Sequence, residues 1–187
     1  MLTLVLAGCS SGSNGQKDSP GDASVSDNTS PSTSQSEIAI PSPKDVTAVD
    51  VCGLMPGDAA SKLGLGPDGE KDEGGSSASS ACVWENSESY KSVSLSPILD
   101  RSLSVYYENT SEFVDFKKLK ILENPGVRAN KSKPMESGSC SVYVATRQNQ
   151  LVNSFATVPV NEIGKSDPCV PAKKALELSL PSWPAAK

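Results

Sequence analysis

The chain has 187 residues, of which 36% are hydrophobic, which suits one globular domain and leaves little room for a second. The formal net charge of −5 divides into −3 over residues 10–43 (one lysine, four acids) and −2 over residues 44–187 (16 basic, 18 acidic residues), so no cationic field for nucleic acid is expected. The chain contains no histidine, and it therefore lacks the commonest general base and the commonest metal ligand.

The first nine residues are a short apolar run that ends in Leu-Ala-Gly-Cys, the pattern of a lipoprotein signal segment. The thiol of Cys9 would carry a diacylglyceryl group, and two or more acyl chains hold a protein stably on a membrane. A signal peptide also needs a positively charged start and an apolar core of roughly 7–15 residues. No Lys or Arg precedes Cys9, so we expect the true start codon to lie upstream of Met1. The expected location is the extracytoplasmic face of the cell membrane.

Residues 10–43 consist almost entirely of Ser, Thr, Pro, Gly, Asp and Asn. Such a segment cannot bury enough apolar surface to offset its ordering entropy, so we predict a disordered tether. A flexible coil of this length spans about 30 Å on average, enough to hold a domain clear of the lipid headgroups. Its composition also suits O-glycosylation.

A single folded domain is expected over residues 44–187, where apolar residues become frequent. Its first helix is predicted at residues 59–63, after Pro56 and before Gly64 as the C-terminal cap. Residues 66–80 are Gly, Ser and acidic residues, which favour a loop. Alternation of apolar and polar residues then predicts strands at residues 82–84 and 93–95.

The second half of the domain is predicted to contain more strands and a last helix. Residues 103–107 favour a strand or a crossing connection, and residues 112–116 favour a helical turn. Strands are predicted at residues 118–121 and 127–129, on either side of a turn at residues 124–126. Residues 140–146 and 150–158 are expected to form a hairpin. Asp167 and Pro168 begin a helix that Pro181 ends, and its apolar stripe contains Cys169, Ala172, Leu176 and Leu180. This order predicts an α+β domain, an antiparallel sheet flanked by a short N-terminal helix and a C-terminal helix.

Four cysteines remain when Cys9 is assigned to the lipid, and an even number outside the cytoplasm favours disulfides with three pairings open. Two of them lie at helical segments near the domain ends and two lie on predicted strands. We therefore predict the pairs Cys52–Cys169 and Cys82–Cys140. A four-cysteine zinc site is disfavoured because the sequence has no C-x-x-C cluster.

The order of these features resembles a known family. The Leu-Ala-Gly-Cys motif of a lipoprotein signal, called the lipobox, and the Ser-rich tether come first. Four cysteine-containing motifs follow: Val51-Cys52-Gly53-Leu54, Cys82-Val83-Trp84, Ser139-Cys140-Ser141-Val142 and Asp167-Pro168-Cys169. Together they are similar to the actinobacterial lipoproteins of the domain-of-unknown-function family 3558 over roughly residues 45–181. The resemblance implies a secreted, lipid-anchored domain with a PsbP-like or Mog1-like α+β sheet, and it implies no catalytic residue.

Catalytic chemistry is poorly supported by the residues present. Without histidine, Ser-His-Asp, Cys-His and H-E-x-x-H sites are excluded, and no Ser-x-x-Lys motif occurs. Two carboxylates would suffice for a glycosidase, but only two tryptophans are available to line a sugar cleft. Trp84 is expected to pack against a disulfide and Trp183 to cover an edge. Residues 68–79 lack the Gly and Glu that a calcium loop needs at its sixth and twelfth positions, so no metal and no cofactor is expected.

One basic run stands out in an otherwise acidic chain. It contains one acid, Glu123, and six basic residues: Lys117, Lys118, Lys120, Arg128, Lys131 and Lys133. Lys118 and Lys120 are predicted to share one face of a strand, opposite Leu119 and Ile121. The run is either a solvated face that protects a sheet edge or a face for an anionic partner such as lipid headgroups or an acidic envelope polymer or protein.

These observations predict a membrane-anchored, non-catalytic binding or accessory module that recognises a protein or envelope component through its sheet face. The first alternative is a carrier that shelters a small apolar or lipidic ligand between sheet and helices. A carboxylate-based hydrolase is the third interpretation. The predicted partners are the membrane, through diacylglyceryl-Cys9, and an envelope ligand, with no nucleic acid.

Overall fold

The computed structural model describes residues 38–72 and 80–187, and Cys9, residues 10–37 of the predicted tether and residues 73–79 lie outside the described residues. The described residues fall within one compact unit. Among the described residues, no helix is long and apolar enough to cross a membrane. The predicted anchor and most of the predicted tether are thus left as sequence-based expectations.

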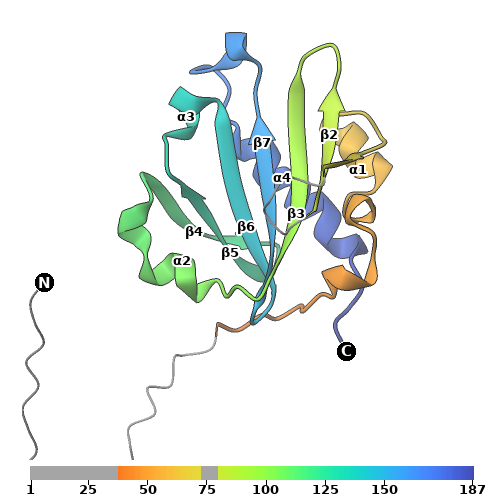
Figure 1. Cartoon of the computed structure of the whole chain (residues 1–187), viewed down its shortest axis with the longest axis vertical. Coiled ribbons are helices and arrows are strands. Elements are labelled where there is room, and N and C mark those ends of the chain that lie inside the picture. Colours follow the sequence, from red (N-terminus) through yellow and green to blue (C-terminus); the bar gives the residue numbers. More distant parts are fainter. Residues whose placement is uncertain (1–37, 73–79) are drawn as a thin grey trace, which may run out of the picture. The chain divides into compact units, whose positions relative to one another are not determined.

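Within the described part, seven strands form one antiparallel sheet in the order β1-β2-β3-β7-β6-β5-β4 (Figure 1). The chain leaves the middle of the sheet after β3, enters the far edge as β4, and returns through β5, β6 and β7 to pair with β3. The strands are β1 (Glu70–Asp72), β2 (Ala81–Asn86), β3 (Lys91–Leu99), β4 (Asp115–Ile121), β5 (Asn124–Asn130), β6 (Ser139–Arg147) and β7 (Gln150–Thr157).

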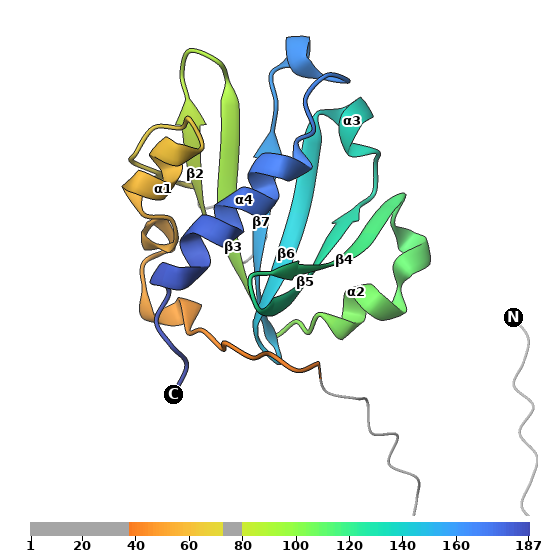
Figure 2. The same ribbon diagram turned by 180° about the vertical axis from the view of Figure 1, so that it is seen from behind.

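Short helices accompany the sheet, and the longest, α4, lies diagonally across one of its faces (Figure 2). The predicted first and last helices are confirmed as α1 and α4, and the whole is the α+β fold expected from the sequence. The helices are α1 (Gly57–Lys62), α2 (Ser104–Glu108), α3 (Pro134–Ser137) and α4 (Cys169–Ser179), with 3-10 turns at Val46–Ala48, Val51–Leu54, Thr110–Glu112, Val160–Glu162 and Leu180–Ser182.

The two faces of the sheet carry two separate apolar clusters. The larger cluster lies under α4 and α1, where alternate residues of β2, β3, β6 and β7 meet the buried stripe of α4. Trp183 is 2% exposed in this cluster and its Nε1 donates a 2.7 Å hydrogen bond to the Leu54 carbonyl, so it belongs to the core and does not cover an edge. The smaller cluster, on the opposite face, joins α2 to β5 and the ends of β6 and β7.

The predicted disulfide pairing was wrong. The structure joins Cys52 to Cys82 and Cys140 to Cys169, with Cα–Cα separations of 5.0 Å in both pairs. Strands β3 and β7 lie between β2 and β6. Three inter-strand spacings of about 4.8 Å therefore separate Cys82 from Cys140 by roughly 14 Å, twice the distance that a disulfide can bridge. Each strand cysteine instead bonds to the helical segment that covers its own strand.

The folded domain begins before Lys44, the residue at which the sequence placed its start. The side chain of Asn124 accepts a 3.1 Å hydrogen bond from the Ser42 N–H and donates a 2.8 Å bond to the Ser42 carbonyl. Ile38 and Ile40 pack against the smaller apolar cluster. Residues 38–43, predicted as tether, are therefore part of the domain.

Residues 103–107, expected as a strand or a crossing connection, lie mostly in helix α2, within the connection that crosses from β3 to the far edge of the sheet. One local prediction in the middle of the chain differs from the structure. The expected turn at residues 124–126 lies inside β5, and the chain turns instead at Leu122, whose φ is +52°. Pro125 lies at the start of β5, before the residues that pair with β6, which begin at Gly126.

Candidate functional site

The structure divides the predicted basic run between two faces of the sheet. Lys118 and Lys120 share one face of β4, opposite Leu119 and Ile121, as the alternation predicted. Lys117 lies on the other face, beside Arg128 of the paired strand. The six basic side chains therefore do not form one continuous patch.

Several of these cations are already paired within the protein. Arg128 bonds to the Asp115 carboxylate at 2.5 Å, and Lys133 to Glu136 at 2.8 Å. The Nζ of Lys118 lies 4.1 Å from the centre of the Tyr107 ring, a cation–π geometry, and Lys131 is exposed. Because β4 is an edge strand, its lysines oppose pairing with another strand. This arrangement favours edge protection over a concentrated anion site.

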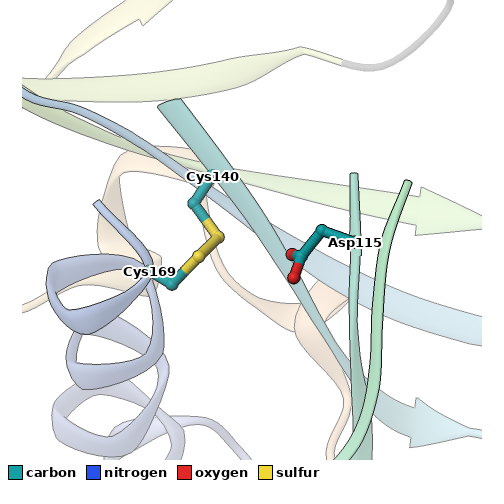
Figure 3. Close-up of side chains that lie close together, drawn as sticks. All are labelled: Asp115, Cys140 and Cys169. Carbon is teal, nitrogen blue, oxygen red and sulfur yellow. A yellow bond between two sulfur atoms is a disulfide. The ribbon is translucent and has the colours of Figure 1, made fainter. Parts of the chain in front are cut away.

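A second cluster joins a carboxylate to a disulfide. Ligand atoms of Asp115, Cys140 and Cys169 lie within 4.8 Å of one another (Figure 3). The two sulfurs are bonded to each other and offer no thiolate, and Asp115 is held by Arg128 and by a 2.9 Å hydrogen bond from Asn130. The cluster therefore stabilises the junction of β4, β5, β6 and α4 and has no open position for a metal ion.

The face of the sheet opposite α4 is only partly covered. Alternation along β3, β6 and β7 sends every second residue toward this face, and the other residues into the core under α4. Tyr106 of α2 stacks on Tyr143 with ring centres 4.5 Å apart, which closes one end of this face. Across the middle of β2, β3, β7 and β6, no described helix lies over it (Figure 1).

Nine side chains of β3, β7 and β6 form a three-by-three grid on this face, which we call the hydroxyl face, and Tyr106 covers its corner at Tyr143. Seven carry a hydroxyl group, one is an amide, and the central one is a phenyl ring. The strand register aligns them in three rows: Ser92, Thr157 and Ser139; Ser94, Phe155 and Ser141; Ser96, Asn153 and Tyr143.

The geometry of the hydroxyl face is that of a flat, uncharged, hydrogen-bonding surface. The hydroxyl oxygens of Ser92 and Thr157 are 2.8 Å apart across two strands. Phe155 is 38% exposed, whereas the other eight residues are half-buried. Burial raises the pKa of Tyr143 to about 12, so this phenol stays neutral and able to donate a hydrogen bond at physiological pH.

Charged residues on the same side of the sheet surround the grid. Arg101 lies near Tyr143 at one end, where it bonds to the Tyr106 hydroxyl. The register pairs Glu85 with Ser92, and it pairs Glu70 with Val83, which in turn pairs with Ser94. At the opposite edge, Lys118 and Lys120 stand on β4. The same face is thus acidic along β1 and β2, neutral in the middle and basic along β4.

A hollow of about 410 Å³ lies between the sheet and the helices, and Ser92 and Thr157 of the hydroxyl face also line it. Its apolar lining comes from the turn after α1, β3, the segment after β7 and α4: Leu63, Leu65, Val93, Val158, Val170 and Pro171. Lys91 and Lys174 stand at its rim with acidic partners, Glu162 at 3.6 Å and Glu177 at 3.7 Å.

The hydroxyl face was not predicted as a site from the sequence, although part of its signal is visible there. Serines at positions 92, 94 and 96 alternate with core residues, which marks one polar side of a strand. The other two residues of each row come from β7 and β6, more than 40 residues away along the chain. Only the strand order brings Phe155 to the centre.

Comparison with known proteins identifies a family and no individual relative. No curated protein and no solved structure matches the chain. One family model, described as "Protein of unknown function (DUF3558)", matches residues 4–182, nearly the whole length. On that match, the chain belongs to the DUF3558 family.

Proposed function

We propose that this protein is a non-catalytic binding module, anchored by lipid on Cys9 at the extracytoplasmic side of an actinobacterial membrane, and that its hydroxyl face recognises a component of the cell envelope. The observation that carries the proposal is the grid of uncharged side chains on β3, β7 and β6, over the middle of which no described helix lies. A sheet face with an exposed aromatic side chain at its centre is suited to binding a partner, and its hydroxyl and amide groups have no general base beside them for catalysis.

Two other features support this assignment. Disulfides persist in oxidising compartments, and two of them hold the described domain together. The carboxylate beside the Cys140–Cys169 disulfide, Asp115, is bound to Arg128 and Asn130, which leaves it unsuited to acid–base work.

Sedimentation with envelope fragments tests the binding role. The purified chain, mixed with isolated envelope fragments, is expected to sediment with them, and the double variant Ser94→Arg/Phe155→Ala to remain in solution. Val160→Ser is the matched control, because Val160 is 86% exposed but lies outside the hydroxyl face. Equal sedimentation of the wild type and the double variant would refute the role of this face.

Metabolic labelling tests the anchor. Cells that express the gene in the presence of an alkyne fatty acid are expected to yield a labelled, membrane-associated protein. Cys9→Ser is expected to remove the label and release the protein from the membrane fraction. A labelled Cys9→Ser variant would exclude Cys9 as the acceptor.

The hollow between the sheet and the helices favours a second candidate, a carrier of a small apolar or lipidic ligand. Its volume of about 410 Å³ is within the range of small-molecule sites. Solvent extraction of the purified protein followed by mass spectrometry is the test. A retained lipid that is absent from a Val170→Arg variant would support the carrier, because Val170 lines the hollow and is 64% exposed.

A further inference from the structure

We propose that the hydroxyl face binds an uncharged, hydroxyl-rich glycan chain, with one sugar ring stacked on Phe155. This inference rests on the proposed binding function and names the chemical class of its ligand. Four properties of the face support it: its nine side chains carry no charge, seven of them carry hydroxyl groups, a phenyl ring lies at the centre, and the residues lie on one face of a sheet.

The absence of charge within the grid excludes the commonest envelope polyanions as the central ligand. None of its nine side chains is ionised at neutral pH, since the pKa of Tyr143 is raised to about 12. Phosphate and carboxylate groups are normally held by Arg and Lys. The guanidinium of Arg101 lies near Tyr143 at one end of the grid, where it donates a 3.5 Å hydrogen bond to the Tyr106 hydroxyl, and Lys118 and Lys120 stand on β4, beyond β5. A neutral ligand fits the centre best.

The hydroxyl groups favour a ligand that is itself both donor and acceptor. Each Ser, Thr or Tyr hydroxyl donates one hydrogen bond and accepts others, as sugar hydroxyls do. The grid repeats at about 4.8 Å across the strands and about 6.8 Å along them. It therefore offers regularly spaced partners, and the Ser92–Thr157 contact shows that neighbouring hydroxyls can link into a network.

Phe155 supplies the apolar part of such a site. Its ring is 38% exposed on a strand whose inward neighbours, Ser154 and Ala156, are fully buried. A pyranose ring has an apolar C–H face that stacks on an aromatic ring while its hydroxyls point outward. A single aromatic surrounded by hydroxyls matches this amphipathic shape better than it matches an apolar protein surface, which requires several adjoining apolar side chains.

The flat surface favours a chain over a free sugar. The grid lies on one face of three strands. A monosaccharide would contact protein on one side only, and water would still solvate its other side. We expect a dissociation constant on the order of 0.1–1 mM for one site. Several anchored copies that engage one polymer would raise the overall affinity through effective concentration.

Selective treatment of the envelope fragments tests the ligand class. Periodate cleaves the vicinal diols of sugars, and a protease removes envelope proteins. Binding of the full-length chain is expected to survive protease and to be lost after periodate. Loss after protease together with survival after periodate would overturn the glycan assignment, while Phe155-dependent binding to untreated fragments would leave the proposed function intact.

Native electrophoresis through gels that contain mannan, dextran or arabinogalactan provides the second arm, with alginate as the polyanion. At least one neutral polysaccharide is expected to retard the wild type, with little change in about 0.5 M NaCl. Phe155→Ala is expected to weaken retardation about tenfold, the factor that corresponds to about 1.4 kcal/mol of stacking. Val160→Ala is expected to behave as the wild type.

Three outcomes of the electrophoresis would overturn the inference. The first is no retardation by any of the neutral polysaccharides. The second is salt-sensitive retardation by alginate alone that Lys118→Glu/Lys120→Glu abolishes, which would assign the contact to the basic edge. The third is a dimer by light scattering that Phe155→Ala converts to a monomer, which would make a second copy of the chain the occupant.

Discussion

At the scale of single residues, the most constrained position is Gly69, which lies against the Cys52–Cys82 disulfide and the Trp84 ring. A Cβ atom at Gly69 would come within 2.5 Å of both the Cys82 sulfur and Trp84. Trp84 is 1% exposed, in the same cluster as Cys82, which agrees with its expected packing against a disulfide. Neither neighbour can yield easily, because one is cross-linked and the other is a rigid buried ring.

Gly69→Ala is therefore expected to lower the free energy of unfolding by about 1–3 kcal/mol, the usual cost of overpacking a core. Urea denaturation followed by tryptophan fluorescence measures the change. The control is Gly53→Ala, whose Cβ would meet nothing closer than 3.8 Å and should change stability by less than about 0.5 kcal/mol. Equal midpoints for the two variants would contradict this account of Gly69.

Tyr143 makes stability depend on pH in the alkaline range. Burial raises the pKa of its phenol from 10.0 to about 12. As the pH rises, Tyr143 therefore loses its proton at a lower pH in the unfolded chain than in the folded protein. The free energy of unfolding is unaffected by this group below pH 10 and falls between pH 10 and about 12. Two pKa units correspond to about 2–3 kcal/mol. Absorbance titration at about 295 nm should show Tyr143 as the last tyrosine to ionise, while Tyr107, whose pKa burial also raises, shifts in the same direction.

Tyr143→Phe supplies the control for this pH dependence. The variant removes the ionising group but keeps the ring that packs on Tyr106. It should flatten the decline of the unfolding free energy above pH 10 and abolish the late-titrating signal. A decline as steep as that of the wild type would assign the effect to another group.

At the scale of elements, helix α4 is stabilised by the stripe that the sequence predicted. Cys169, Ala172, Leu176 and Leu180 are all 6% exposed or less, whereas Val170 on the same helix is 64% exposed. Leu176→Ala should cost about 2–5 kcal/mol because it leaves a cavity against the sheet. Val170→Ala should change stability by less than about 0.5 kcal/mol. Thermal unfolding of both variants compares the two faces, and similar losses would contradict the packing.

The disulfides connect helical segments to the strands that they cover, across sequence separations of 30 and 29 residues. Loops of this length correspond to about 3.5 kcal/mol each in the chain-entropy description. Cys52→Ser/Cys82→Ser should lose about that much stability and, apart from Cys9, expose no free thiol. Cys52→Ser/Cys169→Ser should expose two. A thiol assay of the denatured variants separates these results, and the reverse counts would restore the pairing predicted from sequence.

Predictability differed among the elements for a physical reason. The β6–β7 hairpin and α4 were foreseen because alternation, helical spacing and turn residues are local signals. Residues 103–107 stayed open between a strand and a crossing connection because Leu103 and Tyr106 face a separate apolar cluster, and five residues are too few to show a helical period. Trp183 was misplaced because its partner, Leu54, lies 129 residues away.

At the scale of the whole molecule, the domain includes residues that resemble tether in composition. Ile38 and Ile40 pack on the smaller cluster, and Asn124, 0% exposed, is satisfied by Ser42 and by the Ala145 carbonyl. A chain shortened to begin at Lys44 should therefore unfold about 2–3 kcal/mol more easily than one that begins at Gln35. Coincident urea denaturation curves would show that residues 38–43 add nothing.

The sequence by itself determined the α+β class, the two terminal helices, the buried stripe of α4 and the membership in a family, because these depend on spacing between near neighbours and on ordered motifs. The tertiary structure alone decided the cysteine pairing and the hydroxyl face. Both depend on the order in which distant strands lie side by side. That order is set by packing between residues far apart in the chain, which leaves no periodic trace along it.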